Sequence, residues 1–167
     1  MPKTMQPIIN RISREQAFML TAQVWAQRST CMRRAVGAVV VINNRIVSHG
    51  YNGAPPGDPH CDGVTCVPEG QIGCARAVHA EANAVNYVPD ALIGDNKTMF
   101  TTESPCIACA ALMMHTKFTA LYYLNEYRVV TGVKHMIAQG IPVYRMTPAG
   151  MIVKKTVVSG ELHETLC

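Results

Sequence analysis

Two short motifs place zinc-binding residue types at spacings that suit a single ion. His79 stands two residues before Glu81, and Cys106 stands three residues before Cys109. A catalytic zinc takes three protein ligands and keeps one position for water, and two cysteines three apart on a helical turn can reach one ion. His79, Cys106 and Cys109 are therefore predicted to hold a catalytic zinc, which would lower the pKa of its bound water to near 7.

Glu81 is predicted to move protons and not to bind the metal. Two residues beyond His79 on a helix, its side chain points in another direction from the ligand but can lie beside the water. A carboxylate there can take a proton from water, place it on a ring nitrogen and later protonate a leaving amine. A zinc module that only binds a partner has no use for such a carboxylate, so Glu81 favours catalysis.

A second set of cysteines predicts a second, structural zinc. Four thiolates form a complete tetrahedral shell that is closed to water, and four cysteines remain in the body of the chain, namely Cys31, Cys61, Cys66 and Cys74. Three of them lie in a Pro- and Gly-rich connection over residues 53 to 75, which such a site would pin to the end of the first helix. The alternative is a set of free buried thiols. Cys167 belongs to neither site.

The elements that must position these residues follow from capping, periodicity and turn signals. Ser13 and Gln16 have the form of a capping box, and the apolar spacing after them predicts a helix over 13 to 28. Two β-rich runs flank Asn43-Asn44, which predicts a hairpin over 37 to 42 and 45 to 52. Beyond the connection, helices are expected over 79 to 88, 106 to 116 and 129 to 139, and strands over 98 to 103, 120 to 125 and 142 to 146. Both zinc motifs thus fall at helix starts.

This order of elements predicts an α/β fold with three layers, α/β/α, around a central five-stranded mixed sheet. One domain is expected over 1 to 167, with its core at 13 to 146. Residues 147 to 167 are a C-terminal extension, read as an edge strand or an oligomer arm with a loose end.

Composition excludes several classes of protein. With 49% hydrophobic and 16% charged residues, the 167-residue chain is far from the composition of disordered proteins. No apolar run approaches the length of a membrane span, and the first residues lack the apolar core of a secretory signal, so a soluble, cytoplasmic protein is expected. The net charge of +4 suits an anionic small ligand or a weak interaction with nucleic acid, but the Lys and Arg residues are scattered and form no polybasic run, so charge alone decides little.

Together the motifs match the H-x-E…P-C-x-x-C signature of zinc deaminases. Over residues 13 to 146 the chain resembles the cytidine/deoxycytidylate deaminase superfamily, and specifically the deoxycytidylate (dCMP) deaminases of bacteria and phages. The resemblance also rests on STC at 29 to 31, RRAVGAV at 33 to 39, GYNGAPPG at 50 to 57 and TESPCIAC at 102 to 109. The GYNG loop is the most discriminating of these.

The resemblance implies hydrolysis of dCMP to dUMP and ammonia, with dCTP or a 5-substituted dCMP as alternatives. It assigns Asn52 to the sugar hydroxyl, the Ala80 N–H to the base carbonyl and the Ser104 carbonyl to the amine. Asn52 has an alternative role, because Tyr-Asn-Gly is also a plain turn. A tRNA or single-stranded DNA deaminase is disfavoured, because the chain offers little aromatic and basic clustering.

The phosphate of such a nucleotide needs a cation. Arg33, Arg34 and Arg128 are candidates because guanidinium matches phosphate in bidentate fashion, and Tyr127 is a candidate to stack on or hydrogen-bond to the ligand. The alternative is that these arginines are solvated surface or subunit contacts.

The resemblance implies further partners. In similar proteins the second zinc has Cys and His ligands, so His60 is an alternative to Cys61. Proteins of this type are often hexamers that dCTP, with Mg²⁺, activates and dTTP inhibits.

Overall fold

The structure, a computed structural model, describes residues 11–62, 74 and 76–167. Its strands form one mixed sheet in the order β2-β1-β3-β4-β5-β6-β7. The bounds are β1 Gly37–Ile42, β2 Arg45–Tyr51, β3 Lys97–Glu103, β4 Phe118–Asn125, β5 Val143–Met146, β6 Ile152–Val158 and β7 Glu161–Leu166. Strands β3, β4 and β5 are parallel, and the remaining neighbours pair antiparallel.

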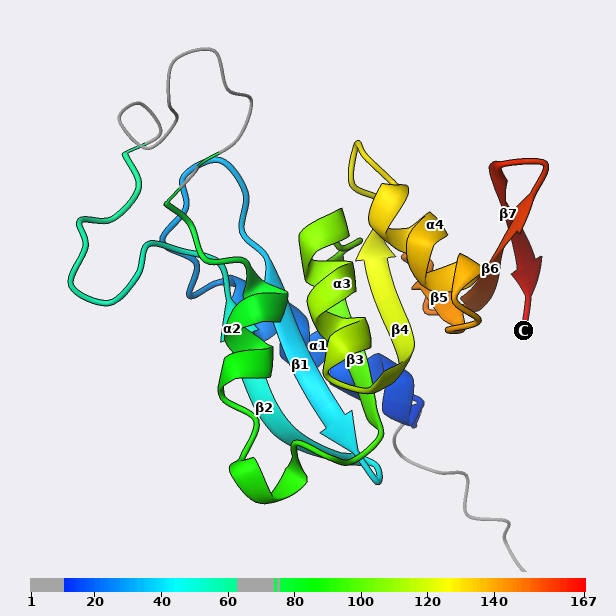
Figure 1. Ribbon diagram of the computed structural model, residues 1–167, viewed down its shortest axis with the longest axis horizontal. Helices are drawn as coiled ribbons and strands as arrows, with labels where there is room; N and C mark the ends of the chain where they lie inside the picture. Colours follow the sequence, from blue (N-terminus) through cyan, green and yellow to red (C-terminus); the bar gives the residue numbers. More distant parts are fainter. Residues whose placement is uncertain (1–10, 63–73, 75) are drawn as a thin grey trace, which may run out of the picture.

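Helices cover both faces of this sheet, as the sequence predicted. Helix α1 (Arg14–Ala26) lies behind the sheet in Figure 1, against β1, β2, β3 and β4. Helices α2 (Ala80–Asn86), α3 (Ile107–His115) and α4 (Thr131–Ala138) lie on the other face. A short 3₁₀ helix, η1 (Asp90–Leu92), leads from α2 into β3.

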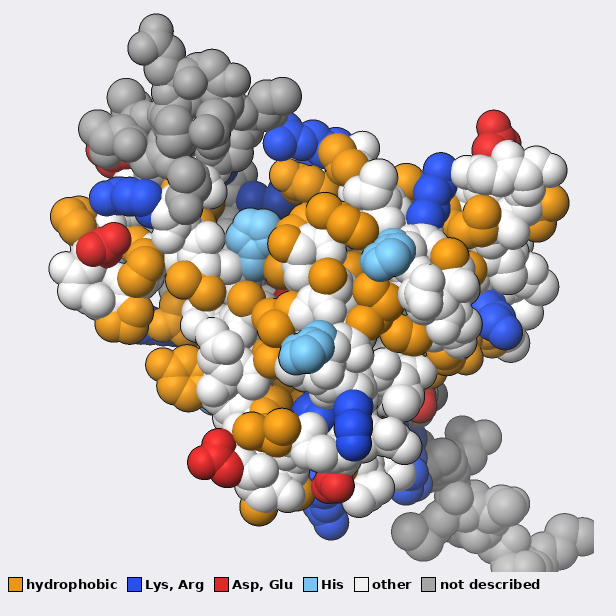
Figure 2. Space-filling view, viewed as in Figure 1, with side chains coloured by type: hydrophobic (Ala, Val, Ile, Leu, Met, Phe, Trp, Pro, Cys, Tyr) orange, Lys and Arg blue, Asp and Glu red, His pale blue; other side chains and the backbone are white. Residues whose placement is uncertain are grey.

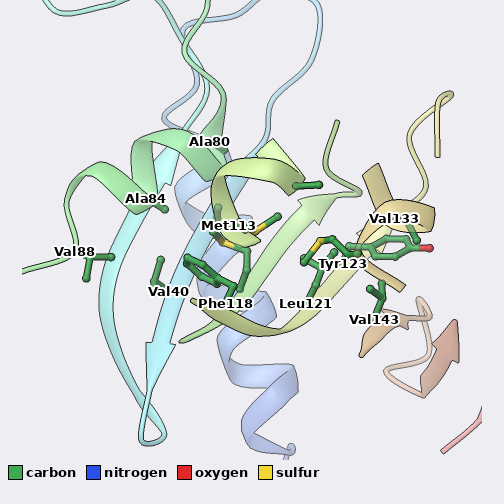
Figure 3. Close-up of a cluster of buried hydrophobic side chains, with 14 residues drawn as sticks. Val40, Ala80, Ala84, Val88, Met113, Phe118, Leu121, Tyr123, Val133 and Val143 are labelled. Atoms are coloured by element: carbon green, nitrogen blue, oxygen red, sulfur yellow. The ribbon is translucent and has the colours of Figure 1, made fainter. Parts of the chain in front are cut away.

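Strand β1 shows how the sequence builds two cores on one strand. Its six residues are all buried, and because successive side chains point to opposite faces, Ala38 and Val40 join the cluster under α2, α3 and α4 while Val39 and Val41 pack against α1. The first cluster includes Met113, which lies near Val40 in Figure 3. Each fully buried valine contributes about 1.5–3 kcal/mol relative to exposure, so β1 anchors both helical layers.

The local signals read from the sequence act as expected. Ser13 caps α1 through its side chain, and the Gln16 side-chain oxygen accepts a hydrogen bond from the Ser13 N–H at 2.8 Å. Asn43 and Asn44 both have positive φ, 49° and 60°, as a tight hairpin turn requires. The predicted capping box and the predicted hairpin are therefore confirmed.

The C-terminal extension differs from the prediction. The sheet has seven strands instead of five, because residues 152 to 166 form a hairpin, β6 and β7, that continues it beyond β5. The expectation of a loose end is wrong. Most side chains of β7 are exposed and polar, so the sequence carries no apolar pattern that would predict this strand. Strand β7 is held instead by hydrogen bonds to β6 and by ion pairs such as Arg145–Glu164. Among the described residues, no helix is long and apolar enough to cross a membrane.

Candidate active site

The candidate site lies where the parallel strands β3 and β4 end. Open α/β sheets place their ligands outside the carboxyl ends of the strands, and here the chain passes from β3 through Ser104 and Pro105 directly into α3. A cavity of about 430 Å³ opens at this edge, within the size range of small-molecule sites. Its walls include His79, Glu81 and Cys106.

The structure brings the three predicted zinc ligands together at the starts of α2 and α3. The Nδ1 atom of His79 lies 3.5 Å from the Cys106 sulfur and 3.4 Å from the Cys109 sulfur, and all three ligand atoms lie within 4.8 Å of one another. Tetrahedral zinc with ordinary Zn–N and Zn–S bond lengths separates its nitrogen and sulfur ligands by about 3.5 Å. The donor set and its spacing therefore fit zinc.

The electrostatics of the triad favour a cation. Hydrogen bonds from the Cys109 thiol and from His79 lower the pKa of the Cys106 thiol to about 3, so this sulfur is a thiolate. The hydrogen bond to Cys106 raises the pKa of His79. The same Cys106 sulfur, together with burial, raises the pKa of Cys109. Because the pKa of Cys109 is raised beside the Cys106 thiolate, both sulfurs can be thiolates at neutral pH only with a positive ion beside them.

Glu81, the second residue of α2, is buried, with only 4% of its surface exposed. Burial raises the pKa of its carboxyl, and a hydrogen bond from its own backbone, the nearby His79 and a hydrogen bond with Cys109 partly oppose that shift. The Glu81 carboxyl therefore faces the triad, in the cavity wall, as a proton shuttle requires.

Close backbone packing fixes the start of α2. A Cβ added at Gly50 of β2 would lie 2.5 Å from the Ala84 nitrogen and closer still to the Ala80 carbonyl oxygen. Asn83, on the same helix, donates to the Tyr51 carbonyl at 2.8 Å. Gly50 thus lets α2, with His79 at its N-cap, rest directly on the edge strand β2.

All the residues assigned to substrate contacts line the cavity, namely Asn52, Ala80, Ser104, Tyr127, Arg34 and Arg128, with Arg33. The hydrogen bonds of Asn52 give it a structural role in this wall. Its Oδ1 accepts from Ser29 Oγ and from the Val36 N–H, and its Nδ2 donates to the Arg34 carbonyl, at 2.7–2.8 Å. The amide therefore ties the 29–36 segment to the GYNG loop and keeps one Nδ2 hydrogen for a ligand.

An aromatic and arginine group forms one side of the cavity. The guanidinium carbons of Arg34 and Arg128 each lie 5.3 Å from the centre of the Tyr127 ring. Arg34 also donates to Glu103 at 2.7 Å, and burial raises the pKa of the Glu103 carboxyl. Sequence reasoning missed Glu103, although it is the last residue of β3, the strand that leads into the second zinc motif.

The second cysteine cluster is only partly described. The Cys61 and Cys74 sulfurs lie 3.8 Å apart, far beyond a disulfide bond and near the separation of about 3.8 Å expected for two thiolates on tetrahedral zinc. Cys66 lies outside the described residues. Within the described ranges, neither Cys31 nor His60 completes a group of three with that pair inside 4.8 Å, and His60 is exposed. Cys31 and Cys74 both line the cavity that holds the triad.

Comparison with known proteins places this geometry in a family. The cytidine and deoxycytidylate deaminase zinc-binding region matches residues 12–125. The chain is 33% identical over 147 residues to ComE operon protein 2 of Bacillus subtilis, covering 87% of this chain and 77% of that protein. It is 39% identical over 124 residues to the deoxycytidylate deaminase of Mycobacterium phage D29, covering 67% of this chain and 94% of that protein.

A solved structure agrees with the sequence matches. The dCMP deaminase of cyanophage S-TIM5, crystallised with dCMP and dUMP, superposes with a TM-score of 0.72 at 33% identity. The match covers 83% of this chain and all of that chain.

Proposed function

We propose that this chain, which belongs to the cytidine and deoxycytidylate deaminase family, converts dCMP and water to dUMP and ammonia. The observation that carries the proposal is the triad of His79, Cys106 and Cys109, with the buried Glu81 carboxyl beside it in a cavity of nucleotide size. A relative of known structure binds dCMP and dUMP. The product would supply thymidylate synthesis.

The chemistry assigns two proton transfers to Glu81. His79, Cys106 and Cys109 would hold the zinc, which lowers the pKa of water from 15.7 to about 7 and so supplies the nucleophile at neutral pH. The Glu81 carboxylate accepts the proton that water loses as its oxygen bonds to C4 of the base, and delivers that proton to N3. It then carries the remaining water proton to the amine, and the C4–N bond breaks to release ammonia.

Backbone groups at the two helix starts orient the base. The Ala80 N–H is among the first of α2, and such groups have no partner within the helix, so it can donate to the base carbonyl. The Ser104 carbonyl stands just before α3 and can accept from the amine. Asn52 offers its remaining Nδ2 hydrogen to the sugar hydroxyl, and Arg34 and Arg128 offer guanidinium groups to the phosphate, with Arg33 as a further candidate.

A second zinc belongs to the same proposal. The 3.8 Å separation of the Cys61 and Cys74 sulfurs supports two thiolate ligands on one ion. Cys31 and Cys66 complete the proposed shell, with His60 as the alternative to Cys61. Such a site would be closed to water and would stabilise the connection after the GYNG loop.

Assembly and regulation complete the proposal. Helix α1 and the segment just before it expose apolar side chains that a homo-oligomer, here a hexamer, would cover: Ile12, Leu20 and Val24. Activation by dCTP with Mg²⁺ and inhibition by dTTP are proposed from the family resemblance. A cytoplasmic location suits the proposed zinc thiolates, which persist in a reducing compartment.

An ammonia-release assay tests the substrate. Purified protein would be offered dCMP, dCTP, 5-methyl-dCMP, cytidine, a tRNA and a single-stranded DNA at equal base concentrations. We expect the highest kcat/KM on dCMP. Faster turnover of dCTP or 5-methyl-dCMP would show that this nucleotide, and not dCMP, is the substrate. Turnover of the polynucleotides alone would show a polynucleotide deaminase, and release of ammonia from none of these compounds would overturn the proposed function.

Positive side chains are scattered over the face drawn in Figure 2, so a polynucleotide track is not favoured there.

A further inference from the structure

A buried lysine in the C-terminal hairpin connects that hairpin to the rim of the cavity. Lys155 of β6 has a side chain only 4% exposed, and its Nζ donates to Glu126 at 2.9 Å and to Glu164 of β7 at 3.1 Å. Burying an ammonium group without partners costs several kcal/mol. Lys155 therefore fixes the positions of both carboxylates.

Glu126 is the important partner, because it begins the segment that carries Tyr127 and Arg128. Its carboxylate also accepts a hydrogen bond from the Tyr123 hydroxyl at 3.1 Å. Yet 42% of the Glu126 side chain is exposed, so without Lys155 only the Tyr123 hydroxyl would keep it from turning toward water. The lysine thus supplies the charge that keeps Glu126 folded against the sheet.

The segment is held from a second side by the zinc-motif loop. The Tyr127 N–H donates to Ser104 Oγ at 2.8 Å, and Ser104 stands between β3 and α3. Two anchors therefore define the place of Tyr127: a hydrogen bond on the side of the active site and an ion pair on the side of the hairpin. The Tyr127 ring in turn contacts the guanidinium groups of Arg34 and Arg128.

The ion pairs form a network that is neutral overall. Arg145 of β5 binds both oxygens of Glu164, at 2.6 and 2.9 Å, so two cations balance the two glutamates. The matched family region ends at residue 125. The network therefore lies outside that region, as do Tyr127 and Arg128.

We infer that Lys155 is a positioning residue for the substrate: through Glu126 it sets the place of Tyr127 and Arg128, and so the affinity of the site for its nucleotide. The inference rests on the proposed deamination of dCMP. It gives the C-terminal hairpin a role in binding, in addition to extending the sheet beyond β5. Because Lys155 touches neither the base nor the metal site, its loss should act on KM and leave kcat nearly unchanged.

The test compares Lys155→Met with the unmutated protein and two controls. We expect the KM for dCMP to rise about tenfold, equal to about 1.4 kcal/mol of binding, with kcat and zinc content little changed. Lys155→Arg, which keeps the charge, should restore most of the affinity. Lys154→Met removes an exposed lysine from the same strand and should leave KM unchanged. A normal KM in folded Lys155→Met, or a loss confined to kcat, would overturn the inference.

Glu126→Gln decides the matter if Lys155→Met does not fold. Glu126→Gln should also raise the KM for dCMP. In the double variant, Lys155→Met with Glu126→Gln, the two effects should not add, because both changes break the same Lys155–Glu126 contact. An unchanged KM in Glu126→Gln would refute the inference. Absence of dCMP turnover in the unmutated protein is a separate outcome, which would refute the proposed function instead.

Discussion

Gly132 of α4 faces the Cys106 carbonyl so closely that a Cβ at this position would lie 2.7 Å from that oxygen. It would lie even closer to the Pro105 carbonyl. Real Cβ atoms do not approach backbone oxygen at such distances, so α4 can pack on the start of α3 only where glycine stands. The spacing of the zinc ligands thus depends on a residue that binds neither metal nor substrate.

Gly132→Ala should therefore disturb the metal site. We expect weaker zinc retention and a loss of about 1–3 kcal/mol in the free energy of unfolding, the usual cost of overpacking. Zinc content after dialysis against a weak chelator, together with denaturant titration, measures both effects. Gly94→Ala is the matched control, because a Cβ there meets no atom within 4 Å. Equal zinc retention in the two variants would show that α4 does not set the Cys106 position.

Glu81→Gln should separate metal binding from catalysis. The amide keeps the size of the side chain but cannot accept the proton, so deamination should fall by about 10³-fold or more, near the upper range for a general acid–base group. Zinc content should stay at the unmutated value. Glu161→Gln, at an exposed position of β7, serves as the control. Activity near the unmutated level in Glu81→Gln would contradict the proposed role of Glu81 in proton transfer.

Arg128→Gln should weaken the binding of nucleotides specifically. If the guanidinium beside Tyr127 meets the phosphate, the KM for dCMP should rise about tenfold, the equivalent of about 1.4 kcal/mol, while deoxycytidine should be processed as before. Steady-state kinetics on both substrates, with Arg45→Gln of β2 as an exposed control, give the comparison. An equal loss on nucleotide and nucleoside would place the phosphate elsewhere.

Zinc content tests the second site. The unmutated protein should hold two zinc ions per chain, and Cys74→Ala should lose one of them together with thermal stability. Cys167→Ala, which changes an exposed terminal thiol, should keep both ions. Mass spectrometry under non-denaturing conditions counts the ions directly. A single zinc in the unmutated protein would rule out the proposed four-ligand site.

The Arg145–Glu164 pair predicts a contribution to stability that depends on pH. Hydrogen bonds from Arg145, and then from Lys155, lower the pKa of Glu164 from 4.5 to about 2. Because the folded pKa lies below the unfolded one, the stabilisation is fully present above pH 4.5 and is lost as the pH falls toward 2. Solvent screens this partly exposed pair, so the contribution should be at most about 1 kcal/mol.

The measurement is the difference in unfolding free energy between the unmutated protein and Glu164→Gln. That difference should be constant from pH 7 to 5 and should shrink on further acidification. Two curves that stay parallel down to pH 3 would contradict the assigned pKa.

The sequence by itself determined the chemistry and most of the local structure. The signals that did so are short-range, because each depends on the geometry of one turn of chain. They are two metal ligands three residues apart, a carboxylate two residues after a histidine, a capping box at Ser13 and paired asparagines at 43 and 44. The layers of helices around a mixed sheet also followed, since the order of helices and strands indicates which faces of the sheet must be covered.

Only the tertiary structure shows which residues that are distant in the chain contact one another. The Arg34–Glu103 pair joins residues 69 positions apart, and Lys155 reaches Glu126 across 29. Strand β7 carries so little apolar pattern that its place depends on backbone pairing and ion pairs with neighbours. Nothing in the sequence marks the contacts of Gly132, and the need for glycine at this position appears only in the packing of α4 against the start of α3. Such contacts have no period along the sequence, because folding alone brings their partners within reach.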